Sequence, residues 1–147
     1  MNIKELLMAD LKDAMKRKEV LRKSVITMLR AAVKQIEVDE RRELTDDEVI
    51  DVVVTQVKQK RSVIDEFLKG DREDLANEAK AEIAVLEKYL PEQLSMDELK
   101  AIIADVISEV GATTMKDMGK VMGMVNPQVK GKADGKTVSQ IVKDYLN

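Results

Sequence analysis

The chain has 147 residues, of which 44% are hydrophobic and 36% charged, a composition typical of a soluble helical protein. It contains no His and no Cys, which excludes a zinc site, a thiol nucleophile and a histidine proton shuttle. No apolar run is long enough to span a membrane, and the first residues do not form a signal peptide. Because a chain without cysteine fits a reducing compartment, we expect a cytoplasmic protein with no membrane partner.

The charges are distributed unevenly along the chain. The net charge is −3, but residues 111–147 contain six Lys and three Asp, a local excess of +3. The remaining residues hold 19 basic and 25 acidic side chains, a net charge of −6. A basic tail on an acidic body predicts an anionic partner for the tail.

The N-terminal part shows apolar residues three and four positions apart, the period of amphipathic helices. This period predicts four helices: Ile3 to about Arg17, Val20 to about Arg42, Asp46–Lys69, and about Arg72–Tyr89. Thr45 and Glu48 form a capping box before the third helix. Gly70 is expected to adopt the left-handed conformation that ends this helix, and Asp71 to cap the fourth.

A boundary follows at residues 91–95, where Pro91 cannot continue a helix. We predict an N-terminal helical domain over residues 1–90, a packed hinge at 91–95 and a C-terminal helical domain over 96–147. Ser95 and Glu98 form a second capping box, which opens a helix that ends at Gly111.

Two further helices are expected in the C-terminal domain. Thr114 can cap one that begins at Met115, which Pro127 kinks or restarts and Gly131 stops. Asp134 can cap the last helix, from Gly135 to about Leu146, whose buried residues are Val138, Ile141, Val142 and Tyr145. With no predicted strand, the fold class is all-α: a larger antiparallel helical part followed by a small three-helix part.

The stretch 117–136 is the candidate functional site. Gly119 and Gly123 lie four residues apart on one helix face, which permits either close helix packing or close approach of a ligand backbone such as a phosphodiester. Between Gly131 and Gly135 there are three residues, so the nucleotide-binding loop with four residues between its glycines does not match. The glycines and lysines offer amides and positive charge to an anion, unless they form only a solvated turn.

A second basic cluster, residues 16–23, is interpreted as a solvated helix face. The three aromatic residues lie on predicted inward faces or at helix ends: Phe67, Tyr89 and Tyr145. A nucleic-acid ligand would therefore be bound by its phosphates and shape, as folded RNA is, and not by base stacking.

Several segments together resemble the GatB/YqeY family, and in particular its free-standing YqeY-like members. They are MGKVMG at 118–123, KGKADGK at 130–136, VSQIVK at 138–143, RELTDDE at 42–48 and LEKYLPEQLS at 86–95. The resemblance covers essentially the whole chain. It implies an all-helical fold and a relationship to the tail of the B subunit of glutamine-dependent aspartyl/glutamyl-tRNA amidotransferase, which contacts tRNA.

The resemblance also implies which residues matter. The positions matching the tail pattern are Gly119, Gly123, Gly131, Gly135, Lys120, Lys130 and Lys132. Asp134-Gly135 is characteristic of free-standing members, whereas amidotransferase tails carry Asn-Pro there. A family-level label of carbon–nitrogen ligase with glutamine as amide donor follows, although that enzyme's active sites lie outside the tail.

The leading hypothesis is a non-catalytic tRNA-binding module that needs no cofactor or metal. Its phosphate contacts would be Lys116, Lys120, Lys130, Lys132 and Lys136, with the four glycines serving backbone approach or close packing. One alternative is an adaptor that docks an aminoacyl-tRNA synthetase or amidotransferase subunit through acidic N-terminal helices. Another is an amidase or amidotransferase, for which no nucleophile is recognisable.

Overall fold

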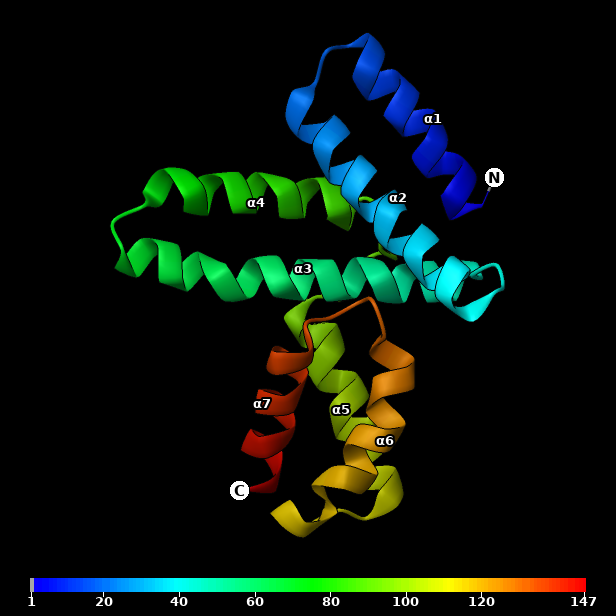
Figure 1. Ribbon diagram of the computed structural model, residues 1–147. Helices are drawn as coiled ribbons and strands as arrows, with labels where there is room; N and C mark the ends of the chain where they lie inside the picture. Colours follow the sequence, from blue (N-terminus) through cyan, green and yellow to red (C-terminus); the bar gives the residue numbers. More distant parts are fainter. Residues whose placement is uncertain (1) are drawn as a thin grey trace. The chain divides into compact units, whose positions relative to one another are not determined.

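The computed structural model describes residues 2–147, which form helices and short connections and contain no strand. The expected all-α fold is confirmed. The chain divides into two compact units, Met1–Leu90 and Pro91–Asn147, and Figure 1 shows the helices of each. None of the helices in the described part of the chain is both long enough and apolar enough to cross a membrane. A hinge function for residues 91–95 stays a prediction.

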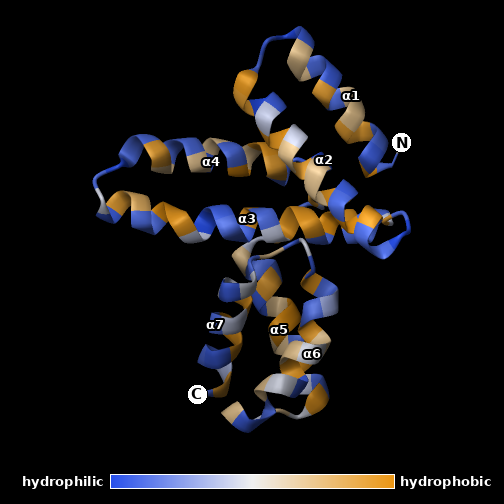
Figure 2. Ribbon diagram, viewed as in Figure 1, coloured by the Kyte–Doolittle hydropathy of each residue, from blue (hydrophilic) through white to orange (hydrophobic). Residues whose placement is uncertain are grey.

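The N-terminal unit consists of two helical hairpins, one packed across the other (Figure 1). Its four helices are α1 (Ile3–Lys16), α2 (Val20–Glu40), α3 (Asp46–Lys69) and α4 (Glu73–Glu87). Apolar residues from all four helices meet in a single core, and Figure 2 shows hydrophobic residues in orange recurring along each helix. The largest fully buried side chains of this core are Leu7, Ile26, Leu29 and Leu86.

Polar contacts between helices fix how the two hairpins pack. The hydroxyl of Tyr89, just after α4, donates a 2.6 Å hydrogen bond to Asp10 of α1. Arg22 of α2 binds Asp13 of α1 at 2.7 Å and lies 3.5 Å from Asp10. This network ties the end of the last helix of the unit to the turn of the first hairpin.

The C-terminal unit is a three-helix arrangement with a short 3₁₀ turn. It comprises α5 (Met96–Val110), the turn η1 (Met115–Asp117), α6 (Met118–Val129) and α7 (Gly135–Leu146). The core contains buried aliphatic residues from all three helices: Leu99, Ile103, Val106, Val121, Val125, Val129, Val138, Ile141, Val142 and Leu146. Three valines supply the buried stripe of α6, so this helix packs with a β-branched face.

The predicted helix caps are mostly confirmed. Thr45 and Glu48 form a reciprocal capping box at the start of α3, and Ser95 and Glu98 do the same at α5. Gly111 ends α5 in the left-handed conformation, with φ of 67°. These sites depend on side chains within three residues of each other, which is why local sequence was sufficient to identify them.

The expectation for the end of α3 was wrong. Gly70 has φ of −90°, and Asp71 instead adopts the left-handed conformation with φ of 57°. The N–H of Arg72 donates to the carbonyl of Phe67 at 2.8 Å, and that of Asp71 donates to Leu68 at 3.2 Å. This is the Schellman pattern shifted by one residue, and it leaves α4 without a side-chain cap.

Three details of the C-terminal unit also differ from expectation. The helix predicted from Met115 starts at Met118, after the 3₁₀ turn. It continues through Pro127 to Val129 without restarting. Tyr145 is not part of the buried face of α7, because 49% of its surface is exposed, and Leu146 is buried in its place. An aromatic ring is therefore accessible on this unit.

Candidate nucleic-acid interface

All five lysines predicted to contact RNA are exposed. Lys116 lies in η1, Lys120 in α6, Lys130 and Lys132 in the α6–α7 loop, and Lys136 in the first turn of α7. Four of them, Lys116, Lys120, Lys132 and Lys136, form no ion pair with another residue of the described chain. Lys130 already interacts with other groups of the protein. The assignment of all five lysines to RNA contacts stays a prediction.

The two faces of α6 have opposite character. Val121 and Val125 are fully buried, whereas Gly119, Lys120 and Gly123 are exposed. A helix turns by about 100° per residue, so the two valines lie on one side and the glycines and lysine on the other. The outer face of α6 therefore presents bare backbone beside an ammonium group.

No other described element packs against these glycines. Apart from adjacent residues and the backbone of its own helix, a Cβ atom built on Gly119, Gly123 or Gly135 would meet no heavy atom of the described chain within 4 Å. Close packing of Gly119 and Gly123 against a neighbouring helix, one of the two expected uses, is therefore not seen in the C-terminal unit. Pro127 has no N–H to donate to the Gly123 carbonyl four residues earlier. The open side of α6 thus combines a missing side chain with a carbonyl that lacks its usual helical donor.

Gly131 differs from Gly119, Gly123 and Gly135 because the backbone conformation of the loop requires a glycine there. The N–H of Lys132 donates to the carbonyl of Val129 at 2.8 Å. Lys130 has φ of −53° and ψ of 122°, and Gly131 has φ of 73°. These values describe a type II turn, which needs a positive φ at its third residue. Gly131 is buried in this turn, while the lysines on either side of it are exposed.

The loop is held by the segment that enters α5. The side-chain amide of Gln93 donates to the Gly131 carbonyl at 2.7 Å, and the N–H of Leu94 donates to the Lys132 carbonyl at 2.9 Å. Two hydrogen bonds to consecutive carbonyls fix the backbone of the turn. Lys132 therefore projects from an ordered loop, so less conformational entropy is lost when its side chain meets a ligand.

The start of α7 is already occupied by a carboxylate. Asp134 accepts hydrogen bonds from the N–H of Thr137 at 3.3 Å and from its hydroxyl at 3.1 Å. This confirms the predicted cap. It also means that the protein's own anion already occupies the Thr137 N–H of the helix N-terminus. The exposed side chains of Lys132 and Lys136 beside it are available to an external phosphate.

Acidic residues are absent from the sequence between Met118 and Ala133. Asp117, at the edge of this stretch, accepts hydrogen bonds from the N–H groups of Thr113 and Thr114 at 3.0 and 3.4 Å. These two bonds, with a smaller contribution from Lys120, lower the pKa of Asp117. The carboxylate therefore stays ionised and faces back toward the preceding loop.

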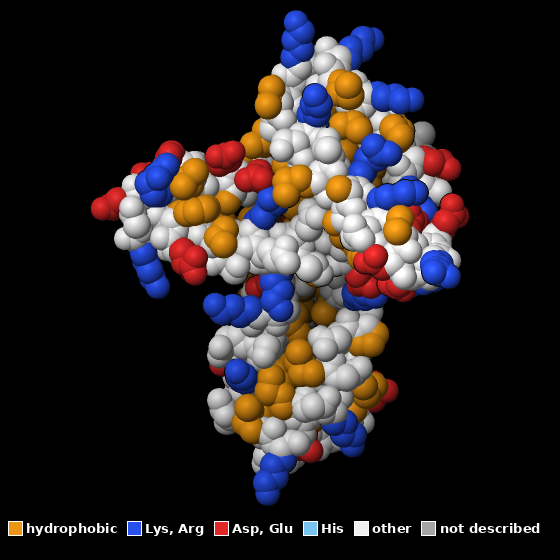
Figure 3. Space-filling model, viewed as in Figure 1, with side chains coloured by type: hydrophobic (Ala, Val, Ile, Leu, Met, Phe, Trp, Pro, Cys, Tyr) orange, Lys and Arg blue, Asp and Glu red, His pale blue; other side chains and the backbone are white. Residues whose placement is uncertain are grey.

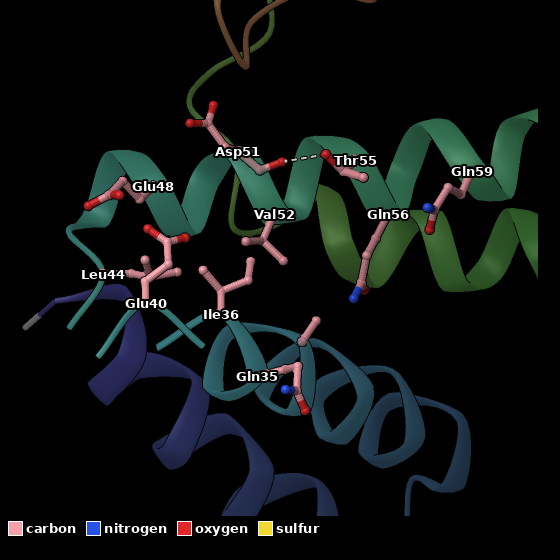
Figure 4. A pocket seen from close by; sticks show the side chains of 11 residues that line it. Gln35, Ile36, Glu40, Leu44, Glu48, Asp51, Val52, Thr55, Gln56 and Gln59 are labelled. Atoms are coloured by element: carbon pink, nitrogen blue, oxygen red, sulfur yellow. Dashed lines mark hydrogen bonds between the residues drawn. The ribbon is translucent and has the colours of Figure 1, made fainter. Parts of the chain in front are cut away.

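The N-terminal unit has a recess of about 510 Å³ between α2 and α3. In Figure 4, Ile36 and Val52 lie at its centre, with Glu40 and Glu48 toward one end. Both carboxylates bind Arg42. Arg42, followed by the Thr45 N–H, lowers the pKa of Glu48 to about 2. A carboxyl group that is ionised at neutral pH cannot serve as a general acid.

The basic surface on α1 and α2 extends beyond residues 16–23, the only part of it that the sequence reasoning had identified. Figure 3 shows Lys and Arg side chains spread over this hairpin. Residues 1–34 hold nine basic and four acidic side chains, a net +5, whereas residues 35–90 hold nine basic and sixteen acidic ones, a net −7. The expectation of acidic N-terminal helices is thus wrong for the first hairpin. Counting charge over shorter windows would have revealed it.

Comparison with known proteins identifies the family. The family model described as "Yqey-like protein" matches residues 4–146. Three relatives share the name "Altered inheritance of mitochondria protein 41, mitochondrial". The relative from Kluyveromyces lactis is 33% identical over 90% of this chain and 69% of its own length. The relative from Pyrenophora tritici-repentis is 28% identical over 95% of this chain and 78% of its own length. The relative from Candida glabrata is 37% identical over 62% of this chain and 51% of its own length.

These relatives contradict the expectation of a cytoplasmic protein, because each is named as mitochondrial. The expectation rested on the absence of cysteine, which excludes disulfides but does not distinguish one compartment from another. The predicted resemblance itself is confirmed. Because the family model matches nearly the whole length of this chain, the chain belongs to the YqeY-like protein family.

Proposed function

We propose that this protein is a non-catalytic accessory module that binds tRNA through the C-terminal unit. The observation that carries the proposal is the outer side of η1 and α6. There, Lys116 and Lys120 stand beside the open backbone of Gly119 and Gly123. Lysine side chains are attracted to phosphates irrespective of sequence, and an exposed glycine lets a sugar–phosphate chain approach the helix backbone.

The α6–α7 loop extends this surface. Lys132 and Lys136 are exposed without an ion pair among the described residues. The type II turn and its two bonds from Gln93 and Leu94 hold the loop in one conformation. The resemblance of these segments to the amidotransferase tail supports tRNA as the ligand, with no role for this chain in the amidation reaction.

Filter binding of labelled bulk tRNA at several salt concentrations tests the proposal. The variant Lys120→Gln with Lys132→Gln should reduce the salt slope of log K by about 2, because each lost phosphate contact changes it by about 1. The matched control is Lys100→Gln with Lys143→Gln, which removes the same charge from α5 and α7. An equal loss in both variants, or no tRNA binding by the wild type at low salt, would contradict the proposal.

The glycines offer an independent test. Gly119→Ala with Gly123→Ala adds two methyl groups to the open face without disturbing any packed neighbour. If the RNA backbone approaches α6 closely, this variant should bind tRNA several-fold more weakly while remaining folded. Gly135→Ala, at the start of α7, is the control for adding a methyl group elsewhere. Unchanged affinity would show that contact is made only through lysine side chains.

A protein adaptor is the second candidate, and the recess between α2 and α3 favours it. Residues 35–90 carry a net −7, and the centre of the recess presents the half-buried Ile36 and Val52. This region suits a basic surface on a synthetase or amidotransferase subunit. Binding of such a purified subunit should survive nuclease treatment and be lost in Ile36→Asp. Binding that disappears with nuclease would reject the adaptor.

A further inference from the structure

A groove of about 530 Å³ runs between α1 and α2. Its charged lining residues are Lys4, Arg30, Lys34 and Glu37. Lys4 and Glu37 pair at 2.8 Å, so their charges offset each other. Neither Arg30 nor Lys34 forms an ion pair with another described residue. The groove therefore keeps two uncompensated positive charges.

The cations follow the direction of the helices. On α2, Lys23, Thr27, Arg30 and Lys34 recur four, three and four residues apart, which places them on one face. The rise of 1.5 Å per residue spreads this row over about 16 Å. On α1, the exposed Lys12 lies two turns beyond Lys4 and about 80° further around the helix. The row of cations along α2, Lys23, Arg30 and Lys34, matches a polyanion with regularly spaced charges better than a single small anion.

The floor of the groove distinguishes between two kinds of polyanion. Leu7 and Val33 line it, but they are 1% and 4% exposed because they belong to the core. Only Met8, at 39% exposure, and Ala31 offer accessible apolar surface. An acidic amphipathic helix would find little surface on which to bury its apolar face. A phosphodiester chain needs no such surface, because counterion release provides its affinity.

We propose that the α1–α2 groove is a second RNA-binding surface, on which Arg30 and Lys34 contact consecutive phosphates of an RNA backbone, flanked by Lys12 and Lys23. This inference rests on the proposed function, since it assigns the same class of ligand to the N-terminal unit. The protein then binds RNA through two separate basic surfaces, one on each unit. None of the described residues that line the groove is aromatic, so recognition there depends on phosphate position and not on base identity.

The test uses the full chain and bulk tRNA in the salt titration. Arg30→Gln with Lys34→Gln should lower the salt slope of log K by about 2. The control Lys58→Gln with Lys80→Gln removes two exposed charges from α3 and α4 of the same unit and should leave the slope unchanged. If Arg30→Gln impairs folding, Lys12→Gln with Lys23→Gln replaces it, since both residues are exposed, and should lower the slope by at least about 1.

The outcomes separate the two proposals. Groove variants with the affinity and slope of their control, beside a weakened Lys120/Lys132 variant, overturn this inference alone. Weakened groove variants beside an unaffected Lys120/Lys132 variant overturn the role of the C-terminal unit alone. Absence of tRNA binding by the wild type overturns both. A groove variant that retains tRNA but no longer binds poly-L-glutamate would make the groove a protein-docking surface and also overturn the inference.

Discussion

In the N-terminal unit, Lys60 pairs with Glu82 at 2.8 Å and Arg61 pairs with Glu87 at 2.8 Å, both between α3 and α4. In the C-terminal unit, Lys120 and Lys132 form no ion pair with the rest of the described chain. The two sets are chemically alike. They differ in whether a neighbouring helix places a carboxylate beside the cation. Glu82 and Glu87 hold Lys60 and Arg61 against the protein, whereas Lys120 and Lys132 have no such partner and are available to a ligand.

The basic cluster at residues 16–23 shows the same contrast within a few residues. Arg22 contacts Asp10, Asp13 and Glu19, and only 20% of its side chain is exposed. Lys23, the next residue, is exposed on the groove side of α2. The prediction of a uniformly solvated face is therefore wrong for Arg22. A run of basic residues can contain a structural cation and an available one side by side.

The largest effect on stability is expected when a structural cation is replaced by an apolar residue of similar length, and an available cation serves as the comparison. Arg22→Met leaves three carboxylates without their shared partner and should lower the free energy of unfolding by about 1–3 kcal/mol. Lys120→Met should change it by less than about 0.5 kcal/mol. Urea denaturation of both variants measures the difference. Equal losses would mean that pairing in the structure does not separate the two groups.

Tyr89 provides the next comparison, because its buried hydroxyl depends on the same network. Tyr89→Phe removes the hydrogen bond to Asp10 and should lower the free energy of unfolding by about 1–2 kcal/mol. Tyr145→Phe changes an exposed ring and should have little effect. A loss in Tyr145→Phe as large as in Tyr89→Phe would contradict the role of the buried contact.

The same residue predicts a dependence on alkaline pH. Burial, reinforced by the hydrogen bond to Asp10, raises the pKa of Tyr89 above its ordinary value of 10.0. Since the folded state then binds the proton more tightly than the unfolded state, this stabilisation is complete below about pH 10 and is lost as the pH rises above it. Thermal melts across this range should show a shallower decline for Tyr89→Phe than for the wild type. Identical slopes would contradict the shifted titration.

The glycines of the C-terminal unit should separate into required and open positions. Gly131→Ala forces a side chain into the left-handed region and should cost about 1–2 kcal/mol of stability. Gly119→Ala and Gly123→Ala, in exposed helix with open space, should each stabilise the protein by up to about 1 kcal/mol. Thermal melts of the three variants check the signs. Destabilisation by Gly119→Ala would indicate a packed neighbour that this unit does not show.

A smaller effect is expected at acidic pH from the capping box of α3. Arg42 and the Thr45 N–H lower the pKa of Glu48 to about 2, from an ordinary value of 4.5. The stabilisation is therefore present above pH 4.5 and lost as the pH falls toward 2. Glu48→Gln should flatten this part of the acid unfolding curve. Glu66→Gln, an exposed change on the same helix, is the control and should leave the curve as it is in the wild type.

The helices, the capping boxes and the turn glycines Gly111 and Gly131 could be predicted because each depends on residues close in sequence. The exposure of the lysines at 116–136 could also be predicted, since the apolar period places Val121 and Val125 on the opposite face. The ion pairs between helices could not be predicted from the sequence. The Lys60–Glu82 pair joins residues 22 apart, and only the packing of two helices decides which carboxylate lies opposite.

The basic groove of the first hairpin remained hidden for a related reason. Its cations are spread over two helices, and Lys4 and Lys34 are brought to the same recess only when α1 packs against α2. Tyr145 illustrates the opposite error. Its spacing placed it on the inward face of α7, but Leu146 fills the core at that end and the ring remains exposed. Periodicity identifies a helix face within about one residue, which is insufficient at a helix end.

The junction of α3 and α4 tests that one-residue error directly. Asp71, not Gly70, has the positive φ, and a Cβ on Gly70 would lie 3.5 Å from the carbonyl oxygen of Glu66, an ordinary contact. Gly70→Ala should therefore stabilise the protein by about 0.4–1 kcal/mol through the unfolded state. Asp71→Gly should remove left-handed strain and raise stability by a similar amount, of order 1 kcal/mol. If Gly70→Ala instead destabilised the protein as Gly111→Ala should, the left-handed residue would be Gly70, as the sequence had suggested.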